Sequence, residues 1–166
     1  MRARAANLLG AHALVASDRM REAADMELSH AAVLTALETF GGGSSIEALR
    51  RVLGLSHSGG VRIVKRLEAQ GLVVREHDPA DARALRLHLS PAGRRMARRL
   101  LAARQAALAP LMDVLDDREA ATLERLLERL LAGVTEDRDD ARRICRLCDP
   151  DVCGHPARCP VTQAAG

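Results

Sequence analysis

The strongest pattern in the chain lies in residues 44–89, where two helical patterns are followed by an alternating one. The first begins with Ser44 and Glu47, which have the spacing of a capping box. The second begins at Ser56, a good N-cap residue, and ends near Gly71, a residue typical of helix C-termini. The apolar positions of the two helices are Ile46, Leu49, Leu53, Val61, Ile63, Val64 and Leu67. Two short helices joined by a tight turn indicate a helix-turn-helix, whose second helix can enter the major groove of DNA.

The segment after the second helix has the pattern of a β-hairpin. Residues 72–75 are β-prone, residues 78–81 carry a turn signal, and leucines occupy every second position in residues 85–89. A strand, a turn and a strand after a helix-turn-helix make a β-wing. The sequence places Arg83 at the tip of this wing, within reach of a phosphate or the minor groove.

Helical patterns flank this unit on both sides. Residues 2–24 are rich in Ala, Leu and Arg at helical spacing, and three glycines at 41–43 end the helix before the helix-turn-helix. After the wing, Ser90 and Pro91 open a helix that is expected to reach about Leu115, because proline is favoured at the first helical position.

The last strong helical pattern begins at Asp116, which forms a capping arrangement with Glu119. It carries a dense apolar face made by Leu123, Leu126, Leu127, Leu130 and Leu131. Such a face must be buried, and one small domain leaves little to bury it. A helix from a second chain is the expected partner, and packing within one chain is the alternative.

The predicted fold is mainly α with a small β-wing, a winged helix-turn-helix combined with a helical dimerisation region. Its expected parts are an N-terminal dimerisation helix (1–28), the DNA-binding winged helix-turn-helix (29–90), C-terminal dimerisation helices (91–135), and a linker with a Cys-rich tail (136–166). The chain has 166 residues, which suits one domain with an appended element.

The amino-acid composition excludes some classes of function. Hydrophobic residues make up 48% of the chain, but Phe40 is the single aromatic residue, which argues against a stacking platform for single-stranded nucleic acid. A net charge of +3 allows only a local basic face. The absence of a signal peptide pattern and of a long apolar run predicts a cytoplasmic protein without membrane contact. Catalytic motifs are also missing, so the protein is not expected to be an enzyme.

The outer side of the second helix carries the candidate DNA contacts, which are His57, Ser58, Gly59, Arg62, Lys65 and Arg66. Its N-terminal end approaches base edges in this docking mode. Arg62 is the best candidate for a bidentate contact with guanine, whereas Lys65 and Arg66 are expected to contact phosphates. The alternative for each single residue is a solvated helix face.

These features resemble the MarR family of bacterial transcription regulators. The resemblance covers roughly residues 8–131 and rests on L-G-L-S-H-S-G-G-V-R-I-V-K-R-L-E-A-Q-G-L-V-V-R, on the wing D-P-A-D-A-R-A-L-R-L-H-L, and on S-P-A-G just after it. It implies a homodimer that binds a pseudo-palindromic operator in double-stranded DNA and represses transcription until a small-molecule effector or an oxidant relieves it. It also implies that Asp81 helps to orient Arg83 toward the minor groove. Gly59 and Gly60 depart from the family pattern, which more often has larger residues there.

The tail holds every cysteine of the chain, Cys145, Cys148, Cys153 and Cys159, in the spacing C-x2-C-x4-C-x5-C. Four thiolates so close in sequence can form a tetrahedral site, and short C-x-x-C loops are usual for structural zinc. His155 could replace one thiolate. An iron–sulfur cluster is an alternative, because Cys159-Pro160 resembles the end of a ferredoxin-type run. A set of redox-active thiols is the other alternative.

A rival function stays open at this point. A helical dimer could use the Cys-rich tail to recruit a partner protein, with winged domains that no longer bind DNA. Salt-dependent binding to DNA separates this interpretation from a transcription regulator, because phosphate contacts release counterions.

Overall fold

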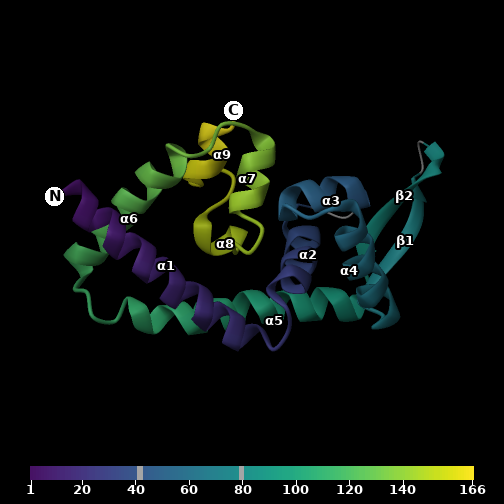
Figure 1. Ribbon diagram of the computed structural model, residues 1–166, viewed down its shortest axis with the longest axis horizontal. Coiled ribbons are helices and arrows are strands. Elements are labelled where there is room, and N and C mark those ends of the chain that lie inside the picture. The colour runs from purple at the N-terminus through teal and green to yellow at the C-terminus, as the bar shows by residue number, and fades with distance from the viewer. Residues whose placement is uncertain (41–42, 79–80) are drawn as a thin grey trace.

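The computed structural model describes residues 1–40, 43–78 and 81–166, without the side chains of Ala82 and Arg83. The elements are α1 (Arg2–Ala24), α2 (Leu28–Thr39), α3 (Ile46–Leu53), α4 (His57–Ala69), β1 (Val73–Asp78), β2 (Asp81–Leu89), α5 (Pro91–Leu108), a 3-10 turn (Ala109–Leu111), α6 (Asp117–Ala132), α7 (Arg138–Ile144), α8 (Pro150–Cys153) and α9 (Pro160–Ala164). The mainly helical fold with one two-stranded sheet confirms the predicted class. In Figure 1, α5 runs along one side and joins a head made of α2, α3, α4 and the sheet to the arms α1 and α6.

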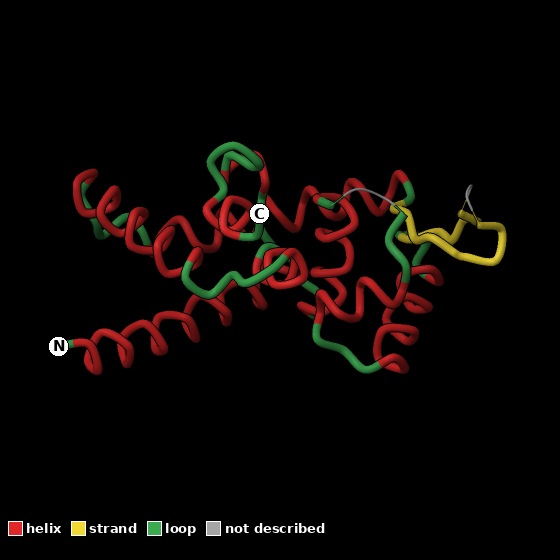
Figure 2. Tube along the Cα trace, turned by 90° about the horizontal axis from the view of Figure 1, so that it is seen from above, coloured by secondary structure: helices red, strands yellow, loops and turns green. Residues whose placement is uncertain are grey.

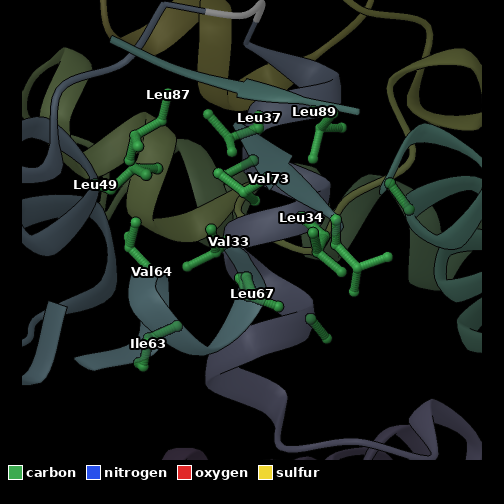
Figure 3. Packing of buried hydrophobic residues seen from close by; sticks show 14 of the residues in the cluster. Val33, Leu34, Leu37, Leu49, Ile63, Val64, Leu67, Val73, Leu87 and Leu89 are labelled. Carbon is green, nitrogen blue, oxygen red and sulfur yellow. The ribbon is translucent and has the colours of Figure 1, made fainter. Parts of the chain in front are cut away.

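The head is built around α2. Every residue from Ala31 to Leu37 on this helix is buried, so that α2 contacts neighbours on all sides. Leu34, Leu67 and Leu87 are completely enclosed, and they come from α2, α4 and β2. Figure 3 shows these aliphatic side chains interdigitating beneath the sheet. The core of the head is therefore aliphatic, as the near absence of aromatic residues predicts.

The wing is an antiparallel hairpin whose inner end closes the core. Val73 pairs with Leu89 and Arg75 pairs with Leu87, so that Leu87 and Leu89 point into the head as predicted. Leu85 is instead 42% exposed, because it lies further along the hairpin, where the strands project beyond the helices. Figure 2 shows the hairpin standing out at one end of the molecule.

The predicted cap of α3 is wrong by one residue. Ser45, rather than Ser44, accepts a hydrogen bond from the backbone N–H of Ala48 at 3.1 Å. Ser44 is drawn into a bridge with β2, and its carbonyl accepts from the backbone N–H of Leu87 at 2.9 Å. Glu47 pairs with Arg50 within α3 instead of completing a capping box. The wing thus fixes where α3 begins.

Helix α5 ends earlier than predicted. Ser90 caps it by accepting from the backbone N–H of Gly93 at 3.0 Å, and Pro91 occupies the first turn. The helix stops at Leu108 and passes into the 3-10 turn that contains Pro110. Proline has no N–H and its ring clashes with the preceding turn, so a helix cannot continue through this position undisturbed.

The arms leave much apolar surface uncovered within one chain. Helix α1 has no buried residue, although its second half packs on α5, and its exposed large apolar residues are Leu8, Leu9, Leu14 and Val15. Helix α6 likewise has no buried residue. The Asp116–Glu119 capping box that opens α6 forms as predicted.

The tail folds back onto the rest of the chain. Figure 1 shows α7, α8 and α9 in the space between α6 and α3, and α7 contacts α3 while α9 contacts α6. The hydroxyl of Thr35 in α2 donates to the carbonyl of Arg146 at 2.6 Å, and Leu147 packs against the core of the head. The segment 136–143, expected to be a solvated helix or linker, contains α7 and is part of this packed unit.

We predict that His30 makes the stability of the head depend on pH. Both of its ring nitrogens are inaccessible and have no hydrogen-bond partner among the described residues. Burial and then the positive charge of Arg66 lower the pKa of His30, against the opposing charge of Glu27. The unfolded chain therefore binds a proton more readily, with a pKa of about 6.5. The stabilising contribution is complete above that value and is lost as pH falls through the lowered pKa of the folded state.

We expect the parent protein to lose more stability between pH 7.5 and pH 5 than His30→Gln, which cannot titrate there. Urea unfolding at the two pH values measures the difference, and the same pH dependence in both proteins would contradict the prediction.

Candidate nucleic-acid interface and cysteine cluster

Helix α4 presents its polar residues on the outside of the head. Ser56 caps the helix by accepting from the backbone N–H of Gly59 at 3.1 Å, as predicted. Ile63, Val64 and Leu67 point inward and are buried. The polar residues His57, Ser58, Arg62, Lys65 and Arg66 are all exposed. The structure thus brings these five candidate contacts to one surface.

Close neighbours explain why glycine occupies two positions in the first turn of α4. Gly60 is buried where α4 crosses α3, and a Cβ atom there would lie 3.3 Å from Cβ of Arg50. At Gly59, a Cβ atom would lie 3.1 Å from the Ser56 hydroxyl that caps the helix. A larger residue at either position would push against the turn that orients α4, so the departure from the family pattern follows from close packing.

The cations of α4 have no acidic partner among the described residues. No ion pair of Arg62, Lys65 or Arg66 occurs there, although Glu68 belongs to the same helix. Glu68 is held by Arg75 of β1 through two hydrogen bonds of 2.7 and 2.8 Å, and both side chains are half-buried. This pair joins the end of α4 to the wing and keeps the carboxylate away from the outer cations.

The wing tip is only partly described. The side chain of Arg83 lies outside the described residues, so the expected Asp81–Arg83 arrangement stays a prediction. Further along the hairpin, the guanidinium of Arg86 binds the carboxylate of Asp78 and donates to the carbonyl of Gly43 at 3.4 Å. Arg86 therefore stiffens the hairpin against the start of the helix-turn-helix, a role that the alternating pattern did not reveal.

All four cysteines line one cavity of about 580 Å³ beside the end of α2. Each is a free thiol. Cys159 is buried and the other three are half-buried. His155 also lines the cavity, and its Nδ1 lies 2.9 Å from the hydroxyl of Thr162. The predicted grouping of the four thiols is thus reproduced in space.

The four thiols lie close enough to shift one another's pKa values. The hydrogen bond from Cys145, the positive charge of Arg104 and the contact with Cys153 lower the pKa of Cys148 to about 6, although burial opposes them. The interaction with Cys148 and burial raise the pKa of Cys145. Burial and the neighbouring sulfur groups raise the pKa of Cys153 to about 12.

Arg104 of α5 is the residue at this cluster that sequence reasoning missed, since it was one of several arginines on the basic side of its helix. Its Nε atom is inaccessible and has no hydrogen-bond partner among the described residues. Its positive charge lowers the pKa of Cys148. In the part of the chain that the structure describes, no three Cys, His, Asp or Glu side chains are yet arranged as a metal-ligand set.

None of the described helices is both long and apolar enough to cross a membrane. A helix-turn-helix followed by a β-wing and carried on a long helix defines the winged helix-turn-helix class. A family model described as MarR family matches residues 24–84, which span α2, α3, α4, β1 and the start of β2. A MarR family protein from Bacillus stearothermophilus has the same fold, with a TM-score of 0.73, 26% identity, and coverage of 80% of this chain and 94% of that protein. Residues 24–84 thus match the MarR family, and the fold resembles that of a MarR family protein.

Two curated relatives match parts of the chain. An uncharacterized HTH-type transcriptional regulator, YsmB of Bacillus subtilis, is 35% identical over 68 residues, which are 41% of this chain and 47% of the relative. A putative transcriptional regulatory protein for the hcr operon of Thauera aromatica is 36% identical over 91 residues, 53% of each protein. The chain thus spans about half the length of the curated relatives it matches.

Proposed function

We propose that the protein is a sequence-specific transcription regulator that binds double-stranded DNA as a homodimer. The observation that carries the proposal is the outer surface of α4, where Arg62, Lys65 and Arg66 are exposed and Glu68 is turned away toward Arg75. An exposed helix of this kind can enter the major groove of DNA. The wing would then lie beside it, over the sugar–phosphate backbone of the DNA. The names of the two curated relatives, both transcriptional regulators, support it.

The homodimer is proposed from the arms. Helix α6 exposes Leu126, Leu127, Leu130 and Leu131, and α1 exposes a second group of apolar residues. Contiguous apolar surface of this kind marks an interface in a soluble protein. A two-fold dimer through the arms would carry two heads, each reading one half of a pseudo-palindromic site. Residues 1–28 and 91–135 would then be the dimerisation region, and residues 29–90 the DNA-binding region.

We assign a repressor role, relieved by a signal at the arms or the tail. Residues that a signal would reach lie around the cavity beside α2, which the cysteines line together with Phe40 and Arg142. The cavity touches both the head and the tail, so a change there can move one against the other. A metal or thiol signal suits these lining groups better than a flat aromatic effector, because Phe40 is the only aromatic side chain available for stacking.

Single substitutions on α4 test the DNA interface. Arg62→Ala should relax the choice of base at one position of the site and cost about 1–3 kcal/mol there, because a bidentate contact with guanine is lost. Lys65→Ala should weaken binding to specific and random DNA alike and flatten the salt dependence. Binding titrations at several salt concentrations measure both effects.

Arg118→Ala provides the matched control, because Arg118 is an exposed arginine on α6, away from the head. It should bind DNA as the parent does. If the two α4 variants also bind specific and random DNA like the parent, α4 is not the reading helix. If the parent shows no salt-dependent DNA binding at all, the rival function of a partner-recruiting dimer is favoured.

A further inference from the structure

The four cysteines occupy places where their side chains can turn toward one point. Cys145 is the C-cap residue that follows α7, Cys153 is the last residue of α8, and Cys159 precedes α9. Cys148 lies in the turn between α7 and α8. All four line the same cavity. We infer that Cys145, Cys148, Cys153 and Cys159 bind one zinc ion, which fastens the tail to the head.

One cavity brings the four sulfur ligands together, although the described side chains do not form a finished metal-ligand set. Each sulfur atom is one rotatable bond from the backbone, so a change of rotamer moves it while the chain stays in place. All four side chains face the same cavity, so the distances to be closed are those across its interior. Four thiolates with a C-x-x-C pair match the ligand set of structural zinc sites, which are tetrahedral and closed.

The tail itself buries little apolar surface. Within residues 136–166, all of which the structure describes, the buried hydrophobic residues are Cys159 and Val161. Leu147 adds a contact to the head. A segment this small buries too little apolar surface to offset the entropy of ordering it. Metal–thiolate bonds supply folding energy of the size that such segments lack.

Arg104 supplies an independent reason to place negative charge at the cluster. Its Nε atom is inaccessible and unpartnered among the described residues, and its charge acts on Cys148. An inaccessible Nε–H group without an acceptor is costly, and a nearby anion would offset that cost. Four thiolates around one Zn²⁺ carry a net charge of −2, which this guanidinium would partly neutralise. Helix α5 thus supplies the counter-charge for a centre that the tail builds.

The proposed centre lies where three parts of the molecule meet. Thr35 of α2 binds the carbonyl of Arg146, between the first two cysteines. Helix α9, which follows Cys159, packs on the arm helix α6. A bound ion would therefore fix the head relative to the arm, whereas the core of the head lies outside the cluster. Removing the ion should loosen the tail first and leave the head folded.

The test uses the full chain, purified reduced and without chelator. We expect one zinc per chain by elemental analysis, and far less than one in Cys148→Ser. His155→Ala is the matched control, because His155 lines the same cavity without being one of the four proposed ligands, and it should keep the full zinc content. Replacing zinc with Co²⁺ in the parent should give the absorption of a tetrahedral cobalt–thiolate site, which needs no variant to fold.

Three results would overturn the proposal. If the parent protein contains no zinc and gives no cobalt–thiolate spectrum, the thiols do not bind a metal ion, and redox chemistry becomes the better account of them. A coloured protein with iron and sulfide would mean a cluster instead of zinc. Loss of zinc in His155→Ala would show that His155 is a ligand in place of one of the four cysteines. Metal content is measured without DNA, so these results stand apart from those on the α4 interface.

Limited proteolysis tests the structural role of the ion. With trypsin, a chelator should speed cleavage at the tail arginines, Arg138, Arg142, Arg143, Arg146 and Arg158, while the head stays protected. Equal cleavage of the tail with and without chelator would contradict the role of zinc as a fastener.

Discussion

Gly93→Ala, in the first turn of α5, should be strongly destabilising, with a loss of at least about 3 kcal/mol in the free energy of unfolding. A Cβ atom at Gly93 would lie 2.0 Å from the carbonyl oxygen of Leu72 and 3.0 Å from its carbonyl carbon. These are backbone atoms, and the same carbonyl accepts a hydrogen bond from the backbone N–H of Ser90 at 3.0 Å. Nothing flexible can move aside, so α5 would have to separate from the wing. Urea unfolding followed by circular dichroism measures the loss.

Two other glycines make a graded control series for this prediction. Gly10 lies inside α1, and a Cβ atom there would have no neighbouring atom within 4 Å, so Gly10→Ala should be neutral or stabilising by up to about 1 kcal/mol. Gly60→Ala should fall between the two, because the nearest atom is a side-chain Cβ at 3.3 Å. If Gly93→Ala unfolds at the same urea concentration as Gly10→Ala, the close approach of α5 to Leu72 is not present in solution.

A double substitution in α6, Leu127→Asp with Leu130→Asp, should convert the proposed dimer into a monomer or an aggregate. These residues are 40% and 52% exposed in one chain, so burial at an interface adds roughly half of the about 1.5–3 kcal/mol that complete burial of a leucine is worth. The variant loses this contribution and also places two carboxylates where water is excluded. Sedimentation measures the molecular mass. Binding to a two-half-site DNA should weaken in parallel, because a monomer carries only one head.

Arg125→Asp with Arg129→Asp is the control for this pair. It puts the same carboxylates on α6 at exposed positions that are away from the leucine face, and it should leave the mass unchanged. An unchanged dimer in the leucine variant would show that the interface lies elsewhere on the chain.

The parts of the fold that follow from local rules could be predicted from the sequence. The caps at Ser56 and Ser90 and the capping box at Asp116 each need only a side chain and a backbone N–H three residues on. The face of α4 also follows, because helical spacing alone separates Ile63 and Leu67 from the outer cations.

Features that depend on distant residues could not be predicted in this way. Ser44 and Glu47 have the spacing of a cap, but the pairing of Ser44 with Leu87 moves the start of α3 by one residue. The need for glycine at position 93 comes from the carbonyl of Leu72, just before β1. The motif S-P-A-G therefore indicated a helix start and nothing of this contact.

The cysteine site was predictable in part. The spacing of the cysteines predicted one cluster, and the structure places all four thiols in one cavity. Its surroundings were not accessible to sequence reasoning, because they come from remote positions. Thr35 meets the tail 111 residues along the chain, and Arg104 reaches it from the middle of α5. The ion itself is a proposal that rests on both kinds of information.

The order of elements along the chain bears on how the molecule is made. Helix α1 leaves the ribosome before the head and α6 leaves after it, and both expose apolar residues within one chain. At typical rates of synthesis, the leucines of α1 wait on the order of seconds for α6 to appear. The head is complete once α5 has emerged, and it can fold during that interval. Nascent chains should therefore present a folded head together with a helix whose apolar side chains are uncovered, which makes them natural clients for chaperones until α6 has emerged.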